Sequence, residues 1–365
     1  MGKRLLIIST GGTIAQKIDD KTLATITTED GRKGDFEKIL PQEDLGKMGI
    51  DSITAQEVTN KDSSNINPED WKKMADAVRD KYDDYDAFII THGTNTLGYT
   101  CSALSFALEN VGKPVILTGS QVTFGLPGSD AGLNLQNAIR VAASPIPLVG
   151  VMAVFGSQII TGTRVLKVTE FDYDGFKSYN TALPLGRIGR EIKFNKEELD
   201  AHSRLYSPAA RNARELKVSA AFDMRIISLT EFPGMTSELM ISLVDSGEVR
   251  GIIFNAVGSG DPNMTKKKED GGEPHEKYDL REGFENAQTR KVPIVVSSQA
   301  ADGIASMALN DPGVEAVSLG AIPGWDMSLE AMTVKLGWLL GNKVKYDDIQ
   351  RQMTMSIKGE MNRER

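Results

Sequence analysis

The fold of this chain is decided by a short stretch of sequence, AFIITHGTNTLGYT at residues 87–100. It begins with apolar and β-branched residues, which are typical of a buried strand. A polar loop with His92, Thr94, Asn95 and Thr96 follows directly. A strand that is apolar on both faces predicts a parallel sheet covered by helices on both sides. Because ligands bind beyond the carboxyl ends of such strands, this loop is a candidate site.

Apolar runs of the same kind recur along the chain and alternate with helix-like stretches. Two of these stretches, PEDWKKMADAVRDKY from Pro68 and YTCSALSFALENVGK from Tyr99, have the periodicity of amphipathic or buried helices. The alternation predicts an α/β fold with a mostly parallel sheet. The predicted strands are residues 5–9, 87–91, 114–118, 149–155, 225–229, 251–257 and 292–298.

The length of 365 residues exceeds the usual size of a single hydrophobic core. Between two strand-rich halves lies a polar stretch with little strand pattern, REIKFNKEELDAHSRLYSPAARNARELK. We therefore predict a larger N-terminal α/β domain at residues 1–190, a linker at 191–220 and a smaller C-terminal α/β domain at 221–365. A charged, glycine-containing stretch at 261–279 predicts a surface loop.

Charge and cysteine usage limit the classes of partner and compartment. The formal net charge of -8 argues against a nucleic-acid groove or an anionic membrane as the main partner. The single cysteine, Cys101, cannot form an intramolecular disulfide, which suits a reducing compartment. The chain opens with a strand-like segment instead of an export signal, and it has no apolar run of about 18 residues. We expect a cytoplasmic protein that acts on a small molecule and contacts neither nucleic acid nor membrane.

Two loops at predicted strand ends carry hydroxyl groups that could attack a carbonyl carbon. In TGGTIA, residues 10–15, two glycines allow a tight turn and Thr13 follows them. In THGTNT, residues 91–96, Thr94 is a second hydroxyl and Asn95 is an amide that both donates and accepts hydrogen bonds. Taken alone, either motif could be an ordinary turn with capping hydroxyls.

A threonine nucleophile needs a base, and few candidates exist. Lysine can serve where its environment keeps it neutral, and GTRVLKVTEFD supplies Lys167, although a lone lysine is more often a solvated surface charge. His92 is expected to be a hydrogen-bonded structural group. The three histidines have no metal-ligand spacing, so no zinc site is expected. Sequence motifs for phosphate loops, dinucleotide loops and serine hydrolases are also absent.

Several motifs together resemble the bacterial and archaeal L-asparaginases, in particular their cytoplasmic type I branch. The resemblance runs in order from about residue 4 to residue 360 and covers nearly the whole chain. The paired threonine motifs are its most specific part. The matching segments are TGGTIA (10–15), DSSNINPEDW (62–71), THGTNT (91–96), GKPVILTGSQ (112–121), SDAGLNLQNA (129–138), G-x-R-x-x-K (162–167) and IPGWDMSLEAMTVKL (322–336).

The resemblance implies hydrolysis of a side-chain amide to an acid and ammonia, without metal or cofactor. Thr13 matches the family's nucleophile, which forms an acyl-enzyme, and Thr94 matches a second threonine that is linked to a lysine matching Lys167. Ser63 matches the serine that holds the substrate α-carboxylate, and Ser64 and Asn95 are further candidates for substrate binding.

The resemblance also implies an intimate dimer whose active sites are completed across the subunit interface. We therefore expect a homodimer or a homotetramer. Asp261, in AVGSGDPN, is a candidate for a group that the neighbouring subunit contributes.

Two departures from the family pattern bear on substrate and rate. Asn95 stands where the family has aspartate, so it cannot supply the charge that faces the substrate α-ammonium and neighbours the lysine. The loss of one charge-assisted hydrogen bond would lower the affinity for a free amino acid by about ten- to a hundredfold. The loop after the first motif, QKIDDKTLATITTED at residues 16–30, also lacks the family's mobile tyrosine.

Three functions remain open from the sequence. The first is an asparaginase-type amidohydrolase, with a substrate range extended to amides whose α-nitrogen is uncharged or differently placed. The second is a weakly active or inactive binder of a small amide or amino acid, because Asn95 replaces the aspartate. The third is the archaeal glutaminase subunit of a tRNA-dependent amidotransferase, which we rank lowest because Thr13 lies too near the start for that subunit's extra N-terminal domain.

Overall fold

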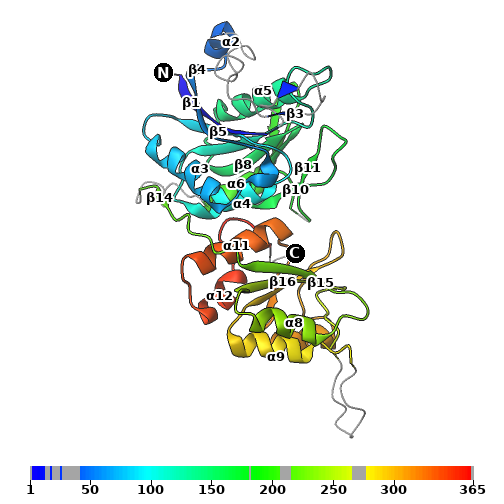
Figure 1. Cartoon of the computed structure of the whole chain (residues 1–365). Coiled ribbons are helices and arrows are strands. Elements are labelled where there is room, and N and C mark those ends of the chain that lie inside the picture. Colours follow the sequence, from blue (N-terminus) through cyan, green and yellow to red (C-terminus); the bar gives the residue numbers. More distant parts are fainter. Residues whose placement is uncertain are drawn as a thin grey trace. The chain divides into compact units, whose positions relative to one another are not determined.

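The computed structural model describes residues 2–12, 17–18, 25–26, 42–180, 182–205, 215–264 and 277–362. The chain divides into two compact units, Met1–Ala220 and Ala221–Arg365 (Figure 1). Each unit is built on a sheet with parallel strands and packed helices. The predicted α/β class, with a larger N-terminal and a smaller C-terminal part, is therefore confirmed.

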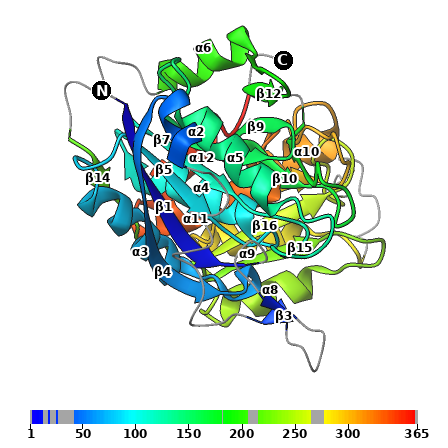
Figure 2. The same cartoon turned by 90° about the horizontal axis from the view of Figure 1, so that it is seen from above.

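The described part of the first unit contains a sheet with the strand order β13-β12-β9-β8-β7-β5-β1-β4. The five strands from β8 to β4 in this order are parallel, and β4 lies beside β1 along most of its length (Figure 2). The other end is closed by short antiparallel strands. The parallel strands are β1 (Lys3–Gly11), β4 (Ile50–Lys61), β5 (Ala87–Thr91), β7 (Pro114–Thr118) and β8 (Gly150–Phe155). The antiparallel ones are β9 (Gln158–Thr161), β12 (Gly186–Ile188) and β13 (Ile192–Phe194).

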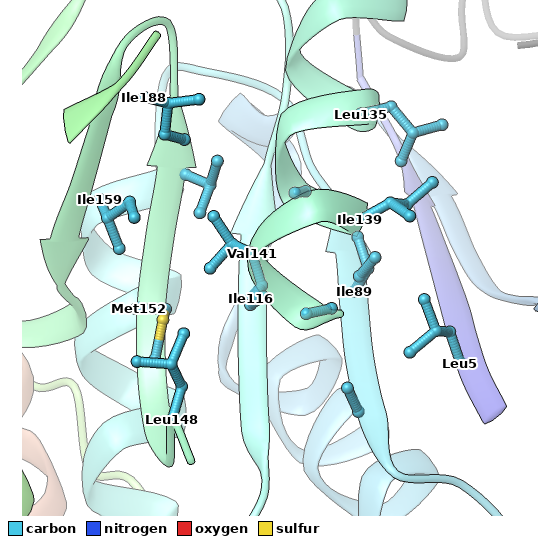
Figure 3. Packing of buried hydrophobic residues seen from close by; sticks show 14 of the residues in the cluster. Leu5, Ile89, Ile116, Leu135, Ile139, Val141, Leu148, Met152, Ile159 and Ile188 are labelled. Carbon is cyan, nitrogen blue, oxygen red and sulfur yellow. The ribbon is translucent and has the colours of Figure 1, made fainter. Parts of the chain in front are cut away.

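Helix α5 (Ala131–Ala142) covers one face of this sheet (Figure 3). Successive strand side chains point to opposite faces, so every second residue of a strand meets the helix. Leu5 and Ile7 of β1 belong to this cluster, together with Ile89 of β5 and Ile116 of β7. Burial on both faces explains why the strands are continuously apolar.

Helix α3 (Pro68–Asp80) connects β4 to β5 and begins with a capping box. The Asn67 side chain accepts from the Asp70 amide, and the Asp70 side chain accepts from the Asn67 amide. These bonds satisfy amides that the first helical turn leaves unpaired. Helix α4 (Leu97–Ala107) follows β5 directly and is almost entirely buried.

In the second unit, the described strands form a parallel sheet in the order β15-β16-β17-β18. One apolar cluster joins Ile252 and Phe254 to Phe284, and another joins Ile253 to Leu336. The strand alternation therefore supplies a core on each face. The strands are β15 (Ile226–Thr230), β16 (Gly251–Ala256), β17 (Ile294–Ser298) and β18 (Ile322–Pro323). The helices are α8 (Ser237–Asp245), α9 (Arg281–Arg290), α10 (Asp311–Ser318), α11 (Leu329–Gly341) and α12 (Tyr346–Met353).

The remaining elements are short, apart from α6, and most flank the first sheet. They are β2 (Lys17–Ile18), β3 (Thr25–Ile26), α2 (Gln42–Lys47), η2 (Ser63–Asn65), β6 (Leu108–Glu109), η3 (Gly162–Arg164), β10 (Val165–Lys167), β11 (Phe176–Ser178), α6 (Lys196–Leu205) and β14 (Lys217–Val218). Within the described ranges, no helix combines the length and apolar character needed to cross a membrane.

Every predicted strand is found, but the sequence reasoning missed four strands of the large sheet. Strand β4 is an edge strand with several exposed side chains, and β9, β12 and β13 are only three or four residues long. Edge and short strands carry weak apolar patterns. The expected linker at 191–220 contains β13, α6 and β14, and it lies at the end of the first compact unit.

Candidate active site

Strand pairing brings the two threonine motifs to one edge of the first sheet. Strands β1 and β5 are parallel neighbours in which Ser9 pairs with Thr91, so Gly12, which follows β1, lies beside the start of the second motif. A Cβ atom on Gly12 would lie 2.4 Å from the backbone of Gly93, and Gly12 has a φ of +77°. Only glycine permits this approach and this conformation. Thr13 itself lies outside the described residues.

Thr94 and Lys167 are in direct contact at this edge. Lys167 ends β10, and its Nζ atom donates to the Thr94 Oγ1 atom at 2.7 Å and to the Asn95 Oδ1 atom at 3.2 Å. The Thr94 residue is only 8% exposed. The fold thus joins a hydroxyl and an amine that are 73 residues apart in the sequence.

Ser63 and Ser64 bind the same loop from the other side. Both lie in the short helix η2, between β4 and α3. The Asn95 amide N–H donates to the Ser63 Oγ atom at 3.2 Å, and the Asn95 Nδ2 group donates to the Ser64 Oγ atom at 3.1 Å. The Thr96 hydroxyl donates to the Ser63 carbonyl at 2.6 Å. The described site residues predicted from the sequence therefore form one connected cluster.

An ion pair holds the base of the serine turn. The Lys61 Nζ atom lies 2.7 Å from the Asp70 Oδ2 atom, and the Asp70 side chain is fully buried. Lys61 ends β4 and Asp70 lies in the first turn of α3, so the pair fixes the chain reversal that carries Ser63. The contact gives the buried carboxylate an oppositely charged partner in place of part of its lost hydration.

His92 is a structural group, as expected. Its Nδ1 atom lies 2.7 Å from the Gly93 carbonyl, which can only accept, so Nδ1 carries the hydrogen. Its Nε2 atom then accepts from the Thr100 hydroxyl at 3.0 Å, and the Trp71 indole N–H donates to that hydroxyl at 3.1 Å. Complete burial lowers the pKa of His92 to about 4, so the ring is neutral at physiological pH.

Sequence reasoning missed one charged group at this site, Glu170. Its Oε1 atom lies 2.7 Å from the Lys167 Nζ atom. Among the residues that the structure describes, Glu170 supplies the only carboxylate that forms an ion pair with this lysine. Glu170 stands three residues after the motif lysine in the segment KVTE, but outside a helix this spacing does not predict a contact.

Two other features expected at the site, the loop at residues 16–30 and Asp261, do not belong to this cluster of described residues. The loop expected to lack a tyrosine, residues 16–30, lies outside the described residues except for 17–18 and 25–26. Asp261 belongs to the second unit, where it accepts from the Ser259 amide and hydroxyl and from the Asn310 Nδ2 group at 2.7 to 3.1 Å. These bonds give Asp261 a role within its own loop.

Comparison with known protein families identifies the class of this site. Residues 4–200 match the family model described as "Asparaginase, N-terminal", and residues 225–353 match "Glutaminase/Asparaginase C-terminal domain". The chain belongs to the asparaginase family. It is therefore an amidohydrolase, and the cluster around Thr94 and Lys167 is its candidate active site.

Individual relatives support this membership over nearly the full length. L-asparaginase 1 of Escherichia coli is 32% identical over 361 residues, which are 98% of this chain and 98% of that protein. A glutamyl-tRNA(Gln) amidotransferase component of Thermococcus kodakarensis is 33% identical, covering 97% of this chain and 76% of that protein. The crystal structure of L-asparaginase I from Vibrio cholerae superposes with a TM-score of 0.81 at 31% identity, covering 99% of this chain and 100% of that one.

Proposed function

We propose that the protein hydrolyses the side-chain amide of asparagine or a related compound to the acid and ammonia through a threonine acyl-enzyme. The observation that carries this proposal is the 2.7 Å contact between the Lys167 Nζ and Thr94 Oγ1 atoms. An amine in contact with a hydroxyl can remove the proton of that hydroxyl or of a bound water. We assign this role to Thr94 and Lys167, and the role of nucleophile to Thr13.

The proposed reaction has two steps. In the first, the Thr13 hydroxyl oxygen attacks the amide carbonyl carbon, the C–N bond breaks, and the nitrogen leaves as ammonia with the proton of the hydroxyl. In the second, water attacks the resulting ester, the C–O bond to Thr13 breaks, and Thr13 regains a proton. Lys167 accepts a proton through Thr94 when the attacking oxygen loses its hydrogen, and it returns that proton to the leaving group in each step.

We assign substrate binding to Ser63, Ser64 and Asn95. The Asn95 side chain is already held at both ends, because its oxygen faces Lys167 and its nitrogen faces Ser64. It carries no charge that could hold an α-ammonium group. Acylation of the α-nitrogen removes its charge. Such amides should therefore bind this site less weakly, relative to free asparagine, than they would bind a site with an aspartate at position 95.

The same observation favours a second candidate function, a weakly active or inactive binder of a small amide or amino acid. An amide locked between Lys167 and Ser64 could hold a ligand without turning it over. Calorimetric binding of asparagine with no product after a long incubation would support this alternative, and rapid turnover would exclude it.

Ammonia release tests the proposal directly. The substrates are L-asparagine, L-glutamine and N-acetyl-L-asparagine, and the variants are the wild type, Asn95→Asp and Thr13→Ala. We expect turnover of at least one amide by the wild type, and a gain of about ten- to a hundredfold in kcat/KM for free asparagine in Asn95→Asp. Thr13→Ala should abolish activity. No turnover of any amide by the wild type would contradict the proposal.

The proposal includes an assembly and a location. We propose a homodimer or homotetramer in the cytoplasm, with the catalytic groups in an N-terminal domain of residues 1–190 and a second domain at 221–365. Light scattering coupled to gel filtration measures the assembly, and a monomeric mass at micromolar concentration would contradict it.

A further inference from the structure

The charge balance around Lys167 suggests a role for a residue that the family motifs leave out. The lysine side chain is only 15% exposed, and the neighbouring loop offers it a hydroxyl from Thr94 and a neutral amide from Asn95. A mostly buried ammonium needs a nearby negative charge to offset its lost hydration. Residue 95 cannot provide that charge.

Glu170 provides it from another part of the chain. Its Oε1 atom is 2.7 Å from Lys167 Nζ, closer than the Asn95 Oδ1 atom at 3.2 Å. Of the elements around the lysine, helix α4 packs against β10 and carries no charged residue, whereas β11 contributes Lys177. The loop between β10 and β11 also carries Asp172 and Asp174.

The loop that carries Glu170 is held at several points by hydrogen bonds, which fix the backbone on which the carboxylate stands. The Gln121 Nε2 group donates to the carbonyls of Thr169 at 3.0 Å and Asp172 at 3.1 Å. The Tyr173 hydroxyl donates to the Gly128 carbonyl at 2.7 Å. Gln121 belongs to the polar loop after β7, so the neighbouring strand end positions this loop.

The far end of the same loop is fixed to the turn between β8 and β9. The Asp174 carboxylate accepts from the Ser157 amide at 2.7 Å and from the Ser157 hydroxyl at 3.1 Å. The Val168 amide donates to the Gly175 carbonyl at 2.9 Å and closes the loop at its base. Asp174 is thus occupied with Ser157, which leaves Glu170 as the loop's carboxylate at the lysine.

We propose that Glu170 is a positioning residue that supplies, from the β10–β11 loop, the carboxylate that Lys167 lacks at position 95. Its Oε1 atom, 2.7 Å from the Lys167 Nζ atom, holds the amine where it contacts the Thr94 hydroxyl. This inference rests on the proposed function of Lys167. Because Glu170 is 76% exposed, water screens the pair and its effect should be moderate.

The test compares Glu170→Gln with Asp172→Asn, a matched loss of one negative charge on the same loop. Trace acetylation of the intact protein with acetic anhydride at one fixed alkaline pH, read by mass spectrometry, gives the labelling rate of Lys167 relative to the other lysines. We expect that rate to rise about threefold to tenfold in Glu170→Gln, because the amine loses the carboxylate that occupies it, and to stay at the wild-type value in Asp172→Asn.

Two further measurements make the test specific. Asn95→Asp in the Glu170→Gln background should restore the wild-type labelling rate, because a carboxylate at position 95 would face the same amine. On whichever amide is turned over, kcat should fall about threefold to tenfold in Glu170→Gln while KM stays at the wild-type value.

An unchanged labelling rate in Glu170→Gln, or an equal rise in Asp172→Asn, would overturn the proposal. The labelling is independent of turnover. If the wild type hydrolyses no amide but Glu170→Gln still shows the expected rise, the proposed function is refuted and the pairing of Glu170 with Lys167 is supported.

Discussion

Two lysines of this protein show how the surroundings of an amine decide its use. Lys167 in the first unit is 15% exposed and contacts a hydroxyl, an amide oxygen and an exposed carboxylate. Lys335 on α11 of the second unit is fully buried, and its Nζ atom lies 2.6 Å from the Oε1 atom of the equally buried Glu360. The Lys167 amine contacts a hydroxyl and is partly exposed to solvent, whereas the Lys335 amine is enclosed with its carboxylate partner.

The partners of Glu360 show that the second pair is structural. Burial alone would raise its pKa, but the Lys335 ammonium and the amides of Ile357 and Lys358 outweigh burial and hold the pKa below its usual range. Lys335 also donates to the Met355 carbonyl at 2.5 Å. The pair therefore joins α11 to the C-terminal segment. The comparison teaches that a candidate catalytic lysine is recognised by its hydroxyl partner and partial exposure, and burial alone does not identify it.

The largest expected effect is on catalysis at the first lysine. Lys167→Met should lower kcat/KM for the best amide substrate by about 10²- to 10⁴-fold, because the proposed proton acceptor is lost. The free energy of unfolding should change little, since the partner carboxylate is exposed and becomes hydrated. Ammonia release and urea unfolding check the two parts. If the variant loses activity only to the extent that it unfolds, Lys167 has a structural role like that of Lys335.

The opposite pattern is expected at the second lysine. Lys335→Met should lower the free energy of unfolding by about 3 to 5 kcal/mol, because the Glu360 carboxylate remains buried without its partner. The folded fraction should keep its kcat. Urea unfolding measures the loss, and the double variant Lys335→Met/Glu360→Leu should recover much of it. Wild-type stability in the single variant would show that the buried pair contributes nothing.

A smaller effect, visible only in acid, is expected from His92. Its folded-state pKa of about 4 lies below the ordinary histidine value of 6.5, so the unfolded chain binds the proton first. Stability is lost as the pH falls from about 6.5 towards 4, by at most about 3 kcal/mol. Histidine ring NMR checks this directly: the His92 signal should not titrate above pH 5. A midpoint between pH 6 and 7 would mean that the ring exchanges protons and belongs with the reactive groups.

Much of the first unit could be predicted from the sequence because its central strands are apolar on both faces. Strands β1, β5 and β7 were predicted within a few residues, and their order along the sheet brings the polar loops together. Edge strand β4 was missed because its side chains are partly exposed, although it leads into the turn that carries Ser63.

The candidate site was predictable in its residue types but not in its charge balance. The motifs named Thr94, Lys167, Ser63 and Asn95, and the apolar run before THGTNT placed Thr94 and Asn95 at a strand end. The position of Glu170 depends on a loop that is held by hydrogen bonds to Gln121, Gly128 and Ser157 elsewhere in the first unit. A three-residue spacing outside a helix does not predict contact, so the ion pair could be seen only in the structure.

The central claim is that Thr94 and Lys167 act as one unit in amide hydrolysis. The most direct test is a double-mutant cycle on kcat/KM for ammonia release, with Thr94→Val, Lys167→Met and the combined variant. Residues that act as a unit give strongly non-additive losses. We predict that the combined variant loses about as much activity as either single variant. Losses that multiply, so that the combined variant equals the product of the two, would contradict the account.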